Sequence, residues 1–324
     1  MDKTASMNGS GVAASVCICT YNGSSRIGMV IDALAAQTQP VKTWEFLVVD
    51  NASTDGTAES VNRLIKEKLG GHGRVVHEAR QGVSFARARA AQEARGEIIC
   101  FLDDDNIPAP DFVAGAISAF AGRPAVGAMG GKILPVWERP PNALALAVQD
   151  FALAICDHGD RAFRHHPKNG PVGAGLCIRS KILKAIYFER DAAAKVTGHQ
   201  GGGVRGGDDF VVGILTWQIG YECWYEPSLK IQHLLPARRM EKEYLLQLYE
   251  GIGRGQAAVR RLCDWKARTP LALVIAAKDI ARWLKRSLQP SSTDPRAQNP
   301  ELARDLNDLE KRLILGRALA AITP

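Results

Sequence analysis

The sequence has few of the features that mark a secreted, membrane-spanning or zinc-binding protein. Its seven cysteines are scattered without a Cys-x-x-Cys pair, which argues against a zinc site and for a reducing compartment. No stretch approaches the roughly 18 uncharged apolar residues of a spanning helix. The polar start, Met1 to Ala14, lacks the basic and apolar regions of a secretion signal. We therefore expect a cytoplasmic protein.

Aromatic residues are also scarce, and the charge is unevenly distributed. Aromatics make up 6% of the chain and do not interleave with basic residues, so no nucleic-acid partner is expected. The formal net charge is +7, and residues 241–324 hold 15 Lys and Arg against 10 Asp and Glu, a local excess of 5. This basic C-terminal part suits an anionic partner, such as a membrane surface or an anionic substrate.

What the chain does have is three consecutive aspartates, Asp103, Asp104 and Asp105, directly after the apolar run 97–102. Three adjacent carboxylates repel one another unless a cation or several hydrogen-bond donors neutralise them. Open α/β sheets bind ligands where their strands end, and carboxylate oxygens suit Mg²⁺ or Mn²⁺. The triplet therefore predicts a site for a divalent cation, with a solvated acidic turn before Pro108 as the alternative.

Strands and helices alternate through the first third of the chain. Apolar runs at 14–20, 44–49, 74–78 and 97–102 predict four strands, with helical periodicity between them. Such alternation predicts a parallel, doubly wound sheet that binds ligands at the carboxyl ends of its strands.

The rest of the chain is less regular and ends in helices. Strand patterns are expected at 125–136, 221–224 and 229–233, and the glycine-rich stretch 198–207 predicts a mobile loop. Helical periodicity resumes at Met240.

A basic amphipathic segment, 271–288, precedes a proline-containing linker and a last helix at 301–322. Two interpretations of the segment stay open. It docks on the anionic inner face of the plasma membrane, or it packs against the catalytic domain or a second subunit.

Polar residues gather where the predicted strands end: at 20–22, at 50–55, at Arg87 and at 103–105. Taken alone, the segment 50–55 is equally typical of a turn with a helix N-cap, and Arg87 of a solvated helix face. Together these loops supply hydrogen-bond acceptors for a base and a ribose, positive charge for two phosphates, and a metal site. A nucleoside diphosphate requires that set.

Four motifs follow one another in this region: Val-Cys-Ile-Cys-Thr-Tyr-Asn (16–22), Phe-Leu-Val-Val-Asp-Asn-Ala-Ser-Thr-Asp-Gly-Thr (46–57), Gly-Val-Ser-Phe-Ala-Arg-Ala-Arg (82–89) and Phe-Leu-Asp-Asp-Asp-Asn-Ile-Pro (101–108). Gly-Ala-Gly (173–175) and Gly-Gly-Asp-Asp (206–209) come later. In order and spacing, these motifs closely resemble the family 2 glycosyltransferases over roughly residues 14–255.

The resemblance implies the GT-A fold, a Rossmann-like mixed α/β sheet flanked by helices, here with a C-terminal helical extension. We expect a flexible N-terminus at 1–13 and a glycosyltransferase domain at 14–239. Within that domain, 14–125 would bind the nucleotide-sugar and 126–239 the acceptor. The extension would span 240–324.

The resemblance also implies roles for individual residues. The nucleotide-sugar-binding set would be Thr20, Tyr21, Asn22, Asp50, Asn51, Ser53, Arg87, Asp103 and Asp104. Within it, Asp50 would contact the base and Arg87 would approach the diphosphate. Asp104 holds the variable position of the Asp-x-Asp motif, so its replacement is predicted to be tolerated better than that of its neighbours.

The metal, Mn²⁺ or Mg²⁺, would be held by Asp105, Asp103 and His233. Asp209 matches the acceptor-activating base, and Asp208 stands where family members usually have Glu, which leaves open which of the two is the base.

The function that the resemblance implies is metal-dependent, inverting transfer of a sugar from a nucleotide-diphospho-sugar, with a UDP-sugar favoured. The acceptor would be a hydroxyl of a saccharide, polysaccharide or glycolipid. Two alternatives are a sugar-nucleotidyltransferase and a non-catalytic sugar-nucleotide-binding protein. The first usually has a glycine-rich phosphate loop after its first strand, where this chain has Thr-Tyr-Asn.

Overall fold

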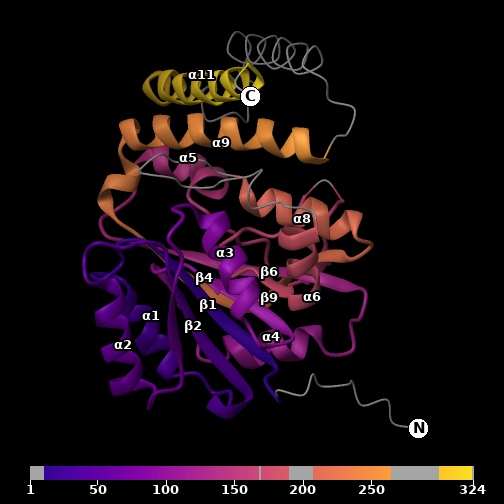
Figure 1. The fold of residues 1–324 in the computed structure, drawn as a ribbon. Helices are drawn as coiled ribbons and strands as arrows, with labels where there is room; N and C mark the ends of the chain where they lie inside the picture. Colours follow the sequence, from indigo (N-terminus) through magenta and orange to yellow (C-terminus); the bar gives the residue numbers. More distant parts are fainter. Residues whose placement is uncertain (1–10, 168, 190–206, 264–298, 323–324) are drawn as a thin grey trace.

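The computed structural model describes residues 11–167, 169–189, 207–263 and 299–322 (Figure 1). Several predicted segments lie outside the described residues: the flexible N-terminus up to residue 10, the glycine-rich loop up to residue 206, the basic amphipathic segment 271–288 and most of the linker. The predicted membrane or subunit contact of that segment therefore stays a prediction from sequence.

The described residues form one mixed sheet with helices on both faces. Its strand order is β3-β2-β1-β4-β8-β6-β9-β5, and β7 pairs with β9 outside this path. The strands are β1 (Ala14–Thr20), β2 (Trp44–Asp50), β3 (Arg74–His77), β4 (Ile98–Leu102), β5 (Asn106–Pro108), β6 (Val126–Trp137), β7 (Phe163–Arg164), β8 (Cys177–Arg179) and β9 (Glu222–Leu235).

The described helices are α1 (Ile27–Ala35), α2 (Thr57–Lys68), α3 (Val83–Glu93), α4 (Phe112–Phe120), α5 (Ala143–Ala152), α6 (Ser180–Lys184), α8 (Asp208–Gln218), α9 (Lys242–Cys263) and α11 (Pro300–Ile322). The short helical turns η1 (Val41–Thr43), η2 (Ala185–Glu189) and η3 (Ala237–Met240) connect them.

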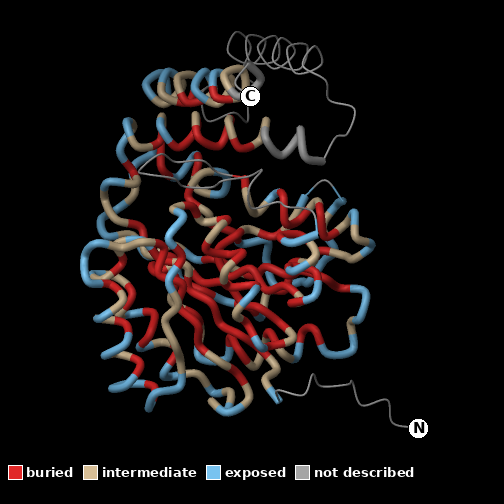
Figure 2. The backbone as a smooth tube through the Cα atoms, in the orientation of Figure 1, coloured by how far each residue is buried: buried red, intermediate tan, exposed pale blue. Residues whose placement is uncertain are grey.

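The four predicted strands of the first third form the parallel part of the sheet, as the sequence predicts. β1 pairs in parallel with β2 and with β4, and β2 pairs in parallel with β3. Side chains of β1 alternate between two cores: Val16 and Ile18 pack with α1, α2 and α4, whereas Cys17 packs with α3, α6 and α8. Both faces of β1, β2 and β4 are therefore buried (Figure 2), which explains their apolar runs, whereas the edge strand β3 is partly exposed.

The part of the sheet that β5 to β9 form differs from the sequence-based expectation in the number and position of its strands. The two strands expected at 221–224 and 229–233 are one long strand, β9, whose pairing with β6 shifts register between Gly130 and Lys132. The shift lets a single strand bend past an irregular position instead of ending there. Residues 106–108 form the short strand β5, which pairs in antiparallel with β9.

The C-terminal helices stack above the sheet, with α9 over α5 and α11 over α9 (Figure 1). α9 and α11 cross closely, because a side chain at Gly253 would collide with the Leu313 backbone and one at Gly316 with that of Glu250. Lys242 also joins the two helices, since its Nζ lies 2.6 Å from Asp305 and 2.9 Å from Asp308. None of the helices in the described part of the chain combines the length and the apolar character needed to cross a bilayer.

Candidate active site

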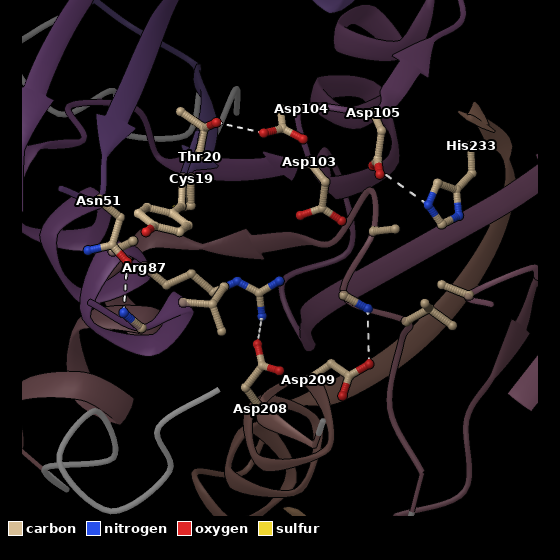
Figure 3. Close-up of a pocket in the computed structure, with 18 of the residues that line it drawn as sticks. Cys19, Thr20, Asn51, Arg87, Asp103, Asp104, Asp105, Asp208, Asp209 and His233 are labelled. Carbon is tan, nitrogen blue, oxygen red and sulfur yellow. Dashed lines mark hydrogen bonds and ion pairs between the residues drawn. The ribbon is translucent and has the colours of Figure 1, made fainter. Parts of the chain in front are cut away.

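Polar side chains at the carboxyl ends of β1, β2 and β4 face one cavity of about 450 Å³ (Figure 3). This volume is typical of a small-molecule site. The cavity brings together most of the predicted site residues: Thr20, Tyr21, Asn51, Arg87, Asp103, Asp104, Asp105, Asp208, Asp209 and His233. The first seven come from the first third of the chain and the last three from α8 and β9, so the fold joins two distant segments here.

Three predicted nucleotide-binding residues, Asn22, Asp50 and Ser53, do not line the cavity. The Asn22 N–H donates to Ser53 Oγ at 2.9 Å, and the Asn22 Oδ1 atom accepts from the Thr54 N–H at 2.9 Å. Asp50 is 5% exposed, with its carboxylate 3.4 Å from His77 Nδ1. Asn22 and Ser53 thus join the loops after β1 and β2, and the contact of Asp50 with a base stays a prediction.

Asn51 fixes the loop between β3 and α3. Its side-chain amide donates to the carbonyl oxygens of Glu78 and Arg80 at 3.1 and 2.7 Å, and its Oδ1 atom accepts from the Gly82 N–H at 2.8 Å. The loop thereby presents Gly82 and the start of α3 to the cavity.

The three consecutive aspartates point in different directions (Figure 3). Asp104 and Asp105 lie in a turn after β4, not in extended backbone, so their side chains do not alternate as in a strand. Asp104 accepts hydrogen bonds from Thr20 Oγ1 at 2.6 Å and from Arg26 Nη2 at 2.9 Å. Asp104 thus lines the cavity and has two specific partners, and its tolerance to replacement stays a prediction.

Asp105 is 5% exposed and has a cationic partner. Arg239 Nη2 donates to its Oδ2 atom at 2.8 Å, and Asn106 Nδ2 donates to its Oδ1 atom at 3.1 Å. His233 Nε2 lies 3.6 Å from the same Oδ1 atom. Burial works to raise the pKa of Asp105, but the positive charge of Arg239 helps to hold it below its usual value.

Asp103 differs from its two neighbours in its partners. Its carboxylate points into the pocket between its two neighbours (Figure 3), and within the described residues no side chain donates a hydrogen bond to it. Burial, and then the charge of Asp105, raise the pKa of Asp103 to about 6. A cation bound beside it would lower that pKa and favour the ionised form.

Asp208 and Asp209 begin α8 and have different partners. Asp208 forms an ion pair with Arg87, whose side chain is only 5% exposed. Asp209 accepts one backbone hydrogen bond on each oxygen, from Gly173 N–H at 3.2 Å and from Phe210 N–H at 2.9 Å. Burial, and then the Asp208 charge, raise the pKa of Asp209 to about 6. Asp208 is thus bound to a cation, whereas Asp209 is poised to take up a proton near neutral pH.

The structure adds residues that the sequence-based reasoning gave no role. Arg26 and Arg239 are the cationic partners of Asp104 and Asp105. Tyr244 and Leu248 of α9 form part of the cavity wall, together with Leu153 at the end of α5. Of these residues, only Arg239 could have been suspected from the sequence, because it lies shortly after His233. The predicted boundary at residue 239 stays a prediction, although α9 contributes to the cavity.

A preformed metal cluster is not present in the described ranges: they contain no group of three or more His, Cys, Asp or Glu side chains arranged to hold a metal ion. The donor atoms nevertheless fit a hard cation. The carboxylates of Asp103 and Asp105 line the cavity together with His233, which is 3% exposed and whose Nε2 atom lies 3.6 Å from Asp105 Oδ1. Mg²⁺ commonly takes one or two carboxylates and completes its shell with substrate phosphates, so three protein ligands are not required.

Comparison with known proteins supports this architecture. The family model described as glycosyl transferase family 2 matches residues 15–184. Among curated relatives, the glucosyl-dolichyl phosphate glucuronosyltransferase of Haloferax volcanii is 26% identical over 246 residues, which cover 72% of each chain. Glycosyltransferase AglE of the same organism is 32% identical over 119 residues, or 37% of this chain and 38% of AglE.

Solved structures share the fold. The mannosyltransferase PcManGT from Pyrobaculum calidifontis, in complex with GDP-Man and Mn²⁺, superposes with a TM-score of 0.61 at 21% identity, covering 95% of this chain and 86% of PcManGT. Residues 1–349 of S. aureus TarS with UDP-GlcNAc give a TM-score of 0.51 at 16% identity, covering 94% and 90%. At this identity the likeness concerns the fold, and it confirms the predicted GT-A architecture.

Proposed function

The chain belongs to glycosyl transferase family 2, and from this premise we propose that it is a metal-dependent, inverting enzyme. It is a glycosyltransferase that draws its sugar from a nucleotide sugar. The observation that carries the rest of the proposal is the meeting of Asp209 and the acidic turn 103–105 in one cavity. Inverting transfer needs a base for the acceptor hydroxyl near a site for the departing diphosphate.

Asp209 is the proposed base. It lies at the N-terminus of α8, where two backbone N–H groups orient its carboxylate. With a pKa of about 6, it is mostly ionised at neutral pH and still basic enough to accept the hydroxyl proton as the oxygen attacks the anomeric carbon. Asp208 is the weaker candidate, because its carboxylate is held by Arg87.

The acidic turn is the proposed metal site. Asp103, Asp105 and His233 would hold Mn²⁺ or Mg²⁺, with Asp105 as the principal ligand. When bound, such an ion neutralises the charge that builds up on the departing nucleoside diphosphate. Support comes from two solved neighbours in complex with Mn²⁺, PcManGT with GDP-Man and GalNAc-T7 with UDP and GalNAc. Because their nucleotide bases differ, the donor test needs both UDP- and GDP-sugars.

The acceptor is proposed to be a saccharide carried on a lipid. Besides its polar residues, the cavity is lined by the apolar side chains of Leu153, Val172 and Leu248. An apolar part of the lining suits an acceptor with an apolar part more than a free sugar. The name of the relative from Haloferax volcanii also describes action on a dolichyl phosphate-linked sugar.

The test is a turnover assay with Mn²⁺ over a panel of UDP- and GDP-sugars, offered prenyl-phosphate-linked and free saccharide acceptors. Asp209→Asn should lower turnover about 10²–10⁴-fold while donor binding persists, and the anomeric configuration of the product should be inverted. Asp111→Asn, which changes the exposed N-cap residue of α4 outside the cavity, is the matched control. Unchanged turnover in Asp209→Asn would favour a non-catalytic sugar-nucleotide-binding protein, and pyrophosphate release from a nucleoside triphosphate would favour a nucleotidyltransferase.

A further inference from the structure

Arg239 holds two of the three side chains that the proposed metal would use. Its Nη2 atom donates to Asp105 Oδ2 at 2.8 Å, and its Nη1 atom lies 2.8 Å from His233 Nε2. A guanidinium group can only donate hydrogen bonds, so His233 Nε2 must accept with its lone pair. One guanidinium therefore occupies a carboxylate oxygen and an imidazole lone pair, two kinds of atom that bind Mn²⁺.

The three side chains differ in how freely they can move. The side chains of Asp105 and His233 are 7% and 4% exposed, whereas that of Arg239 is 24% exposed. Arg239 also lies in η3, a four-residue turn between β9 and α9, and it lines the cavity. Rotation of its long side chain into the cavity would uncover both Asp105 and His233 without moving the strands that position them.

A metal ion and the guanidinium cannot share the single lone pair of His233 Nε2, and they compete for the carboxylate of Asp105. Asn106 Nδ2 already donates to Asp105 Oδ1 at 3.1 Å, so the remaining oxygen, Oδ2, is the one that Arg239 holds. Two cations at one carboxylate also repel each other. A diphosphate changes this balance, because it brings enough negative charge to bind the metal and to accept paired hydrogen bonds from the guanidinium.

Building on the proposed metal-dependent function, we propose that Arg239 is a built-in competitor of the divalent metal at Asp105 and His233. The diphosphate of the donor ends the competition, because it accepts the hydrogen bonds that the guanidinium otherwise donates to Asp105 and His233. The metal is then held tightly only together with a diphosphate, and free metal binds weakly.

The experiment is a titration of the whole protein with Mn²⁺ alone, with the free ion measured by electron paramagnetic resonance. Arg239→Gln should bind Mn²⁺ at least about tenfold more tightly than the unmodified protein, since it loses a competing charge-assisted contact. Arg238→Gln, which changes the exposed neighbouring arginine, should leave the affinity unchanged. With Mn²⁺ and inorganic pyrophosphate as the probe, Arg239→Gln should bind pyrophosphate more weakly than the unmodified protein.

A Mn²⁺ affinity of Arg239→Gln equal to or below that of the unmodified protein would overturn the competition. Should Arg239→Gln not fold, Arg239→Lys decides the question, because it keeps the charge but cannot bridge both ligands, and it should also bind Mn²⁺ more tightly. Asp105→Ala separates this inference from the proposed function. If it retained Mn²⁺-dependent donor binding, the metal site itself would be wrong; if it lost that binding while Arg239→Gln had no effect, only the competition would fail.

Discussion

The guanidinium of Arg87 and the carboxylate of Asp208 form an ion pair inside the cavity, although the two residues lie 121 positions apart in the chain. The pair joins α3 to the start of α8. It also separates two adjacent aspartates that the sequence leaves equivalent. Asp208 is bound to a cation, and Asp209 keeps its carboxylate available for a proton.

Removal of Arg87 should destabilise the protein and change its pH dependence. Arg87→Met leaves Asp208 buried without its partner, which should lower the free energy of unfolding by about 3–5 kcal/mol. It also removes a cation that lowers the pKa of Asp209, so activity should begin to fall at a higher pH than in the unmodified protein. Denaturant unfolding and a pH–rate profile measure the two effects. Arg89→Met, which breaks a half-exposed pair with Glu93 on the same helix, should change stability by no more than about 0.5 kcal/mol.

The pH–rate profile of the unmodified enzyme should fall on its acidic side near pH 6. The base works only when ionised, and burial together with Asp208 raises the pKa of Asp209 to about 6. Activity should thus be full above about pH 7 and should decline as the pH drops through 6, to roughly a tenth of its maximum at pH 5. Measuring kcat with saturating donor and acceptor separates this effect from donor binding. A decline only near pH 4, where an ordinary carboxyl titrates, would contradict the assignment of Asp209.

Asp104 should prove sensitive to replacement, contrary to the expectation from its position in the motif. Asp104→Ala removes the acceptor for Thr20 Oγ1 and the partner of Arg26, two contacts that tie the end of β1 to the turn after β4. Because the Arg26 side chain is about one-third exposed, we expect a loss of only about 1–2 kcal/mol of stability. Thermal unfolding measures the loss, with the exposed Asp111→Ala as control. If Asp104→Ala unfolded at the same temperature as the control, Asp104 would be tolerant to replacement, as its position in the motif predicts.

Leu248 should affect the acceptor and not the donor. Its side chain forms part of the apolar lining of the cavity on α9, so Leu248→Ala should raise the KM for a lipid-linked acceptor about tenfold. Hydrolysis of the donor in the absence of acceptor should be unchanged. Leu246→Ala, a matched change on the same helix outside the cavity, should leave both parameters as they are. A raised KM for the donor alone would place Leu248 in the nucleotide-sugar site instead.

The sequence predicted the parallel part of the sheet well because that part is encoded locally. Strands buried on both faces need continuous apolar runs. The polar loops after such strands fall at one edge of a parallel sheet, whatever the order of the strands. The second part was harder to predict. Whether residues 221–235 form one strand or two depends on pairing with β6, a distant strand, and the local pattern does not contain that information.

By itself, the sequence determined the family, the fold class and which polar segments would form the site, because fixed motifs at fixed spacing specify them. Only the tertiary structure decided which side chains meet. It paired Arg87 with Asp208 and Arg239 with Asp105, it turned Asp104 toward Thr20, and it used Asn22 and Ser53 to join loops. Ion pairs and hydrogen bonds form between atoms that are close in space, and closeness between residues more than a hundred positions apart is set by sheet order and helix packing.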